Sequence, residues 1–119
     1  MGRFFDDDIE IVAGDNHSFS LTMKTLAGAP VNVSAWDVYY KAEARDTNNT
    51  DTISVAPAAV TFSDSGTGTV DTFTIPLSAS DTTVAKGFYD HEIAIKRQGL
   101  IETLTKGTLS VLKRLTAVV

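Results

Sequence analysis

Hydrophobic and polar residues alternate with a period of two along much of this chain, which is the spacing of a β-strand. The stretch 18–24 is the clearest case, because its phenylalanine, leucine and methionine share one face while serine, threonine and lysine occupy the other. Residues 36–45 and 89–96 repeat the pattern. Strands of this kind cover a core with one face and meet water with the other.

Shorter or less regular stretches supply the remaining predicted strands, at residues 8–12, 52–56, 59–62, 69–77 and 100–112. Gln98 and Gly99 stand between two strong strands and predict a tight hairpin. Val70 and Gly107 interrupt the alternation of their strands. Val70 suggests a bulge, and Gly107 suggests a bulge or a close backbone approach. Residues 80–85 are the one plausible helical turn, with serine and aspartate available to cap it.

Seven or eight short strands separated by frequent turn residues are typical of an immunoglobulin-like sandwich. We therefore predict an all-β fold, an immunoglobulin-like antiparallel β-sandwich with at most one short helical turn. A chain of 119 residues amounts to one domain. We expect the sandwich to span residues 8–114, with a flexible N-terminal arm at 1–7 and an apolar C-terminal tail at 115–119.

Composition narrows the function classes. The chain has no cysteine, so a disulfide framework, a thiolate zinc site and a cysteine nucleophile are excluded. A net charge of -5 argues against nucleic-acid binding through a basic surface. Neither an apolar run of membrane-spanning length nor a signal peptide is visible, so we expect a protein made in the cytoplasm with no membrane partner.

Candidate catalytic and metal-binding residues are few, and we predict no enzyme activity, cofactor or metal site. His91 falls on the inward face of its predicted strand, which favours a hydrogen-bonded core role over a ligand role, and His17 is expected at the surface. The acidic run 6–8 favours a solvated flank or a docking site for a basic partner over a cation site. Residues 66–68 lack the lysine and the following helix of a phosphate-binding loop.

Exposed aromatic residues are the first candidates for partner contacts. Tyr39 falls on the polar face of its strand, and Phe4 and Phe5 stand outside any alternation. Aromatic side chains on a wet surface can anchor a protein partner or stack on a sugar. Partial cover by a neighbouring loop is the alternative interpretation for all three.

Charge is unevenly distributed along the chain. Thirteen acidic and five basic residues lie at or before Asp90, whereas two acidic and five basic residues follow it. This excess of positive charge predicts either docking to an acidic partner or a sister subunit, or ordinary protection of an edge strand by lysine. The predicted contact residues of this part of the chain are Lys96, Arg97, Lys113 and Arg114, followed by the apolar Leu115, Val118 and Val119.

Several short motifs together resemble a known family. They lie at residues 9–15, 19–22 and 28–36 in the first half of the chain, and at 75–82, 86–93 and 99–111 in the second half. The first set is similar to a run of the form R-G-D-t … f … l … dG.pvdltgw, and the second to i-x-L-t-a-x-d-T … G-x-Y-x-y-e-i … G-x-v-x-T-l-x-G-x-l-x-V. These runs characterise the immunoglobulin-like N-terminal domain of tailed-phage upper baseplate proteins and related small virion proteins.

This resemblance implies a non-enzymatic structural component of a tailed-phage virion, located on the baseplate, tail or neck. Since no receptor-binding or coiled-coil extension follows Val119, a stand-alone component is expected. Its partners would be other virion proteins and copies of itself in a symmetric assembly, contacted through edge strands and terminal arms. The alternatives are a capsid decoration protein and a carbohydrate-binding module that uses Trp36, Tyr39 or loop residues.

Overall fold

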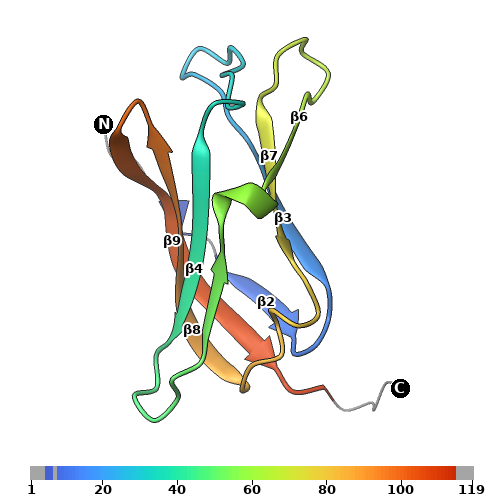
Figure 1. Ribbon diagram of the computed structural model, residues 1–119, viewed down its shortest axis with the longest axis vertical. Helices are drawn as coiled ribbons and strands as arrows, with labels where there is room; N and C mark the ends of the chain where they lie inside the picture. The colour runs from blue at the N-terminus through green and yellow to red at the C-terminus, as the bar shows by residue number, and fades with distance from the viewer. Residues whose placement is uncertain (1–4, 7, 115–119) are drawn as a thin grey trace.

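Two stacked β-sheets make up the computed structural model, which describes residues 5, 6 and 8–114 (Figure 1). The large sheet has the order β1-β9-β8-β4-β5, with β2 also paired to β9, and the small sheet has the order β3-β7-β6. The predicted all-β sandwich is confirmed. In chain order the strands are β1 (Phe5–Asp6), β2 (Ile9–Val12), β3 (His17–Thr22), β4 (Asp37–Ala44), β5 (Thr52–Val55), β6 (Thr61–Ser63), β7 (Thr72–Leu77), β8 (Gly87–Arg97) and β9 (Leu100–Leu112).

Strand order follows the immunoglobulin arrangement. β3, β6 and β7 occupy one sheet while β4, β8 and β9 form the centre of the other, as strands B, D, E and C, F, G do in that fold. β1 and β2 lie one after the other along β9, so nine strand segments occupy eight positions. The count of seven to eight predicted strands agrees with this arrangement.

The two N-terminal strands run parallel to β9, which corrects the prediction of a wholly antiparallel sandwich. Ile9 pairs with Leu109 and Val12 with Leu112. The chain then turns at Gly14, whose positive φ of 83° suits glycine, and passes into the small sheet as β3. The N-terminal strands pair with β9 in the large sheet and do not pair with β3 in the small sheet. Among the described residues, the outer edge of β3 therefore has no partner strand.

The core lies between the sheets and is built from the inward positions of the alternating strands. Along β4 and β8 every second residue is buried, as the period-two pattern predicts. The largest fully buried side chains include Tyr40, Tyr89 and Phe73. Burial of each large apolar side chain contributes on the order of 1.5–3 kcal/mol to folding.

Turn and bulge positions were partly predicted. Gln98 and Gly99 both have positive φ, 51° and 78°, as a tight two-residue hairpin turn between β8 and β9 requires. The predicted bulge at Gly107 is wrong, because Gly107 pairs regularly with His91. The register shift lies instead around Leu104, the extra residue between the partners of Ile93 and Ala94. Leu104 packs against the core, so the bulge adds one inward apolar side chain to β9.

Helical structure is limited, among the described residues, to the 3-10 helix η1 (Pro57–Ala59). The predicted helical turn at 80–85 is an isolated turn in which Ser78 and Asp81 cap one another. The Ser78 backbone N–H donates to the Asp81 carboxylate at 2.8 Å, and the Asp81 N–H donates to the Ser78 hydroxyl at 3.2 Å. Val70, predicted at a bulge, lies in the loop before β7, where its carbonyl accepts a hydrogen bond from the Val33 N–H.

Candidate interaction surfaces

The outer edge of β3 is the longest open strand edge of the small sheet. Within the described residues, β7 is the one strand that pairs with β3, which is six residues long. The strand at the other edge of the sheet, β6, is three residues long. Neither proline nor lysine, the usual protections of an edge, occurs within β3. Phe19 and Leu21 point inward from it and are half-buried, which leaves part of their apolar surface accessible beside the open backbone. Such an edge can accept a further strand from a partner.

A groove of about 270 Å³ opens at one end of the sandwich, beside the end of β3. It is lined mainly by apolar side chains, among them Met23, Trp36 and Leu104. Leu26, on the loop after β3, stands at its rim with 91% of its surface exposed. The sequence analysis missed this groove, because a loop leucine carries no signal of where the loop will lie.

The predicted contact residue Arg97 makes its contacts within the domain. Its guanidinium donates to the Glu102 carboxylate at 3.1 Å and lies over the Trp36 ring, with 5.2 Å between its central carbon and the ring centroid. The ion pair joins β8 to β9 within the hairpin, and the contact with Trp36 connects the hairpin to the residue just before β4. Arg97 therefore shapes a wall of the groove, whereas its neighbour Lys96 is exposed on the opposite face of β8.

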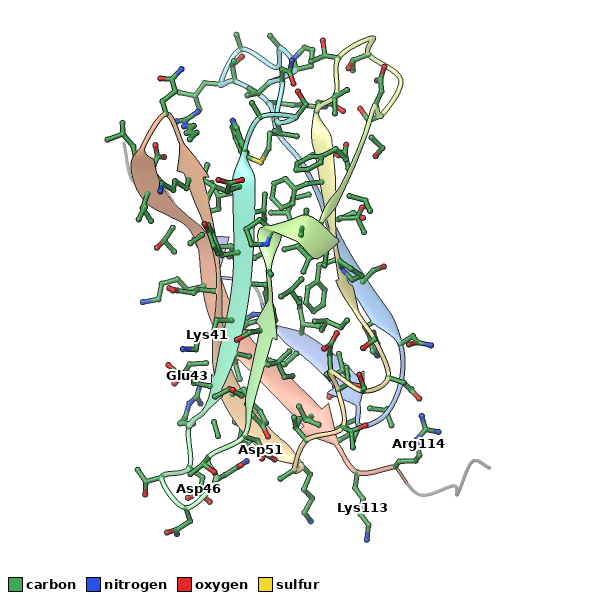
Figure 2. The ribbon with its side chains drawn as sticks, viewed as in Figure 1. Lys41, Glu43, Asp46, Asp51, Lys113 and Arg114 are labelled. Atoms are coloured by element: carbon green, nitrogen blue, oxygen red, sulfur yellow. The ribbon has the colours of Figure 1, made fainter. Side chains whose placement is uncertain are left out.

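Arg114 is likewise engaged inside the domain, at the end opposite the groove (Figure 2). Its guanidinium contacts the Asp15 carboxylate and donates to the Ala13 carbonyl at 3.1 Å. The buried Thr82 hydroxyl in turn donates to the Asp15 carbonyl at 2.6 Å. This arrangement, the C-terminal anchor of Arg114, Asp15 and Thr82, fixes the last described residue to the β2–β3 turn. Lys113 is exposed beside it.

The other predicted contact residues are distributed as follows. Tyr39 is 42% exposed at the middle of the outer face of the large sheet, flanked by β8. Phe5 contributes its backbone to β1 through the pairing with Thr105. Four predicted contact residues lie outside the described part of the chain: Phe4, Leu115, Val118 and Val119.

His91 is buried and hydrogen-bonded, as its inward phase predicts. Its Nδ1 lies 2.8 Å from the Tyr40 hydroxyl, and its ring also packs edge-on against Tyr40 and Phe19. These contacts bring β8, β4 and β3 together and therefore connect the two sheets. His17 is half-buried at the start of β3.

The loop between β6 and β7 is organised around two carboxylates that the sequence analysis did not single out. Asp64 accepts hydrogen bonds from the N–H groups of Gly66, Thr67 and Gly68, and these bonds lower its pKa. Asp71 is buried, and its carboxylate accepts hydrogen bonds from the Ser65 hydroxyl and N–H. These bonds lower the pKa of Asp71 as well. The amides of residues 66–68, which a phosphate would need, are thus occupied by Asp64.

Other chemistry is sparse in the part of the chain described. Asp8, from the acidic run, accepts a hydrogen bond from the Thr108 N–H at 2.9 Å. Among the described residues, no group of three or more histidines and carboxylates is placed to hold a metal ion. Within the same residues, no helix has the length and apolar character needed to cross a membrane.

Neither the scan against protein-family models nor the search of curated proteins returned a match for this chain. The protein is therefore classified by its fold, which is an all-β immunoglobulin-like sandwich.

Proposed function

We propose that this protein is a non-enzymatic structural component of a tailed-phage virion, which docks to neighbouring subunits through an open strand edge and its terminal arms. The motif resemblance, spread over most of the sandwich, supports the virion assignment. The observation that carries the docking mode is the open edge of β3, six residues long and flanked by half-buried apolar side chains. A neighbouring segment that adds to this edge would satisfy its outward backbone groups and cover Phe19 and Leu21.

The C-terminal anchor supports a role for the tail that follows it. Arg114 is tied to Ala13 and Asp15, so the chain beyond residue 114 starts from a fixed point on the domain. A short apolar tail tethered in this way loses less orientational freedom on docking than a tail attached to a mobile end. Residues 115–119 would then contact a neighbouring subunit.

A test of the edge uses phage particles assembled with variants of this protein and purified by density gradient. Ser18→Lys with Ser20→Lys places two charges on the exposed side of β3 and should block strand addition without touching the core. The matched control, Thr61→Lys with Ser63→Lys, places the same charges on the short edge strand β6. We expect the wild-type protein and the control in the particles, and at least about a tenfold loss of the β3 variant.

Two results would overturn the proposal in different ways. Absence of the wild-type protein from purified particles would exclude the virion role. Normal incorporation of the folded β3 variant, checked by circular dichroism, would exclude docking through this edge. Deletion of residues 115–119 tests the tail separately, and normal incorporation of the truncated chain would remove it from the account.

The carbohydrate-binding alternative gains no specific support from the geometry. Trp36 is half-buried and its ring is covered by Arg97, so it offers no open stacking platform. Tyr39 lies among charged residues on the sheet face, away from the polar loops. A capsid decoration protein would use the same edge and tail at another place on the particle, and fractionation of capsids from tails distinguishes the two.

A further inference from the structure

The outer face of the large sheet carries an ordered pattern of charges around Tyr39. Residues that pair across β4, β8 and β9 form ranks perpendicular to the strands, and successive outward ranks lie about 6.8 Å apart. The central rank consists of Tyr39, Ala94 and Thr103. The rank on one side contains Asp37 and Lys96, and the rank on the other side contains Lys41 and Glu92. These four charged residues are exposed.

This arrangement is self-complementary. In a face-to-face pair of identical copies the two-fold axis lies in the plane of contact. When the axis runs along the central rank, each flanking rank of one copy faces the other flanking rank of the second copy. Each residue then faces a residue on the same strand of the second copy. Asp37 then meets Lys41 of the second copy, Lys96 meets Glu92, and Tyr39 meets Tyr39. Each of these four charges is thus placed against its opposite, while Lys106, the fifth charge of the two ranks, meets the exposed Ile101.

Neighbouring positions of the axis do not share this property. An axis along the rank of Lys41 and Glu92 would bring each of these charges against its own copy. An axis midway between that rank and the central one would place Lys96 against Asp90, but it would also place Asp37 against Glu43. Like charges across an interface cost several kcal/mol, which disfavours both of these axes. An axis parallel to the strands, between β4 and β8, would place Asp37 against Lys96 and Lys41 against Glu92, but it would also bring Glu43 against Asp90. The pattern therefore selects the axis through Tyr39.

The surface is large enough for a weak association. Five ranks of outward residues over four strands measure roughly 27 Å by 15 Å, which gives about 800 Å² for the two copies together in flat projection. That area belongs to transient interfaces, below the roughly 1,600 Å² of a standard stable complex.

Among the described residues, Asp37, Glu92 and Lys96 form no ion pair, and the Lys41–Glu43 pair is 3.7 Å long and exposed. Lys41 and Glu43 both point outward from β4, on the side away from the small sheet (Figure 2).

We propose that two copies of this chain associate face to face through the outer face of the large sheet, with the two-fold axis along the rank of Tyr39, Ala94 and Thr103. This interface uses neither the β3 edge nor the tail, so it stands independently of the virion role. It leaves both of those elements accessible to further subunits.

The test is a charge exchange followed by sedimentation equilibrium of the full chain, from about 10 μM to about 1 mM at low salt. Asp37→Lys and Lys41→Asp should each raise the dissociation constant of the dimer at least about tenfold, because each creates two like-charge contacts per dimer. The double variant should restore association to within about threefold of wild type. Residues 37 and 41 of one chain are about 14 Å apart along the strand, so the rescue cannot come from a contact within one copy.

Lys86→Asp is the matched control for Lys41→Asp, because it makes the same charge change at an exposed residue outside this face. It should leave the dissociation constant within about twofold of wild type. A chain that stays monomeric up to 1 mM would overturn the proposal. A dimer that is insensitive to Asp37→Lys, or a double variant no better than the single ones, would overturn it too, since the contact would then lie elsewhere.

Discussion

Thr82→Val tests whether the C-terminal anchor is a stabilising part of the fold. Thr82 is fully buried, and its hydroxyl donates to the Asp15 carbonyl at 2.6 Å and approaches the Ala79 carbonyl at 3.2 Å. Valine has nearly the same shape, so the substitution removes the hydroxyl with little change in packing. The Asp15 carbonyl then loses this donor.

The expected cost follows from these contacts. Loss of one partner of a buried hydrogen bond costs about 1–3 kcal/mol, most of it the desolvation of the group left behind. For a domain of this size each kcal/mol corresponds to roughly 4 °C, so Tm should fall by roughly 4–12 °C. Chemical denaturation monitored by circular dichroism measures the free energy of unfolding, and calorimetry measures Tm.

Thr83→Val is the control one residue further along. Its hydroxyl also donates to the Ala79 carbonyl, at 2.7 Å, but Thr83 is exposed and water can replace the bond. We expect a cost below about 0.5 kcal/mol. Equal effects of the two variants, or no effect of Thr82→Val, would refute the argument that burial gives this hydrogen bond its weight.

Two further predictions concern the loops. Because the pKa values of Asp64 and Asp71 are lowered in the folded chain, their contribution to stability is complete above the unfolded pKa of about 3.9 and is lost as the pH falls through the lowered values. Asp71→Asn should therefore flatten the loss of stability between pH 5 and pH 2, measured by urea denaturation, and an unchanged pH profile would argue against these hydrogen bonds. Gly99→Ala should destabilise the chain by about 1 kcal/mol, because Gly99 has a φ of 78°. Ala94→Gly makes the opposite change within β8. An unaffected Tm in Gly99→Ala would contradict the two-residue turn.

The elements that could be predicted from sequence are those specified by local pattern. β4 and β8 alternate strictly because each has one face in the core, and the Gln98–Gly99 turn follows from residue types that tolerate positive φ. The parallel pairing of β2 with β9 could not be predicted, because a four-residue strand carries no information on which sheet edge it joins. The bulge at Leu104 is set by how β9 fits β8 over its whole length, whereas Gly107 gave only a local signal.

The candidate surfaces divide in the same way. The exposure of Tyr39 and Lys96 follows from their phase within strands and was predicted. The engagement of Arg114 with Asp15 joins residues 99 positions apart, so no local pattern reveals it. The same holds for the stacking of Arg97 on Trp36 and for the open edge of β3, which depends on where the first strand goes.

Amide hydrogen exchange along β3, compared between the free chain and the assembled particle, tests the central claim most directly. In the free chain the amides of residues 17–22 that point away from β7 have no partner strand among the described residues, and they should exchange rapidly. Strand addition by a neighbouring subunit should slow those amides by at least about a hundredfold on assembly, while the amides of β6 change little. Equal exchange rates in both states would contradict docking through this edge.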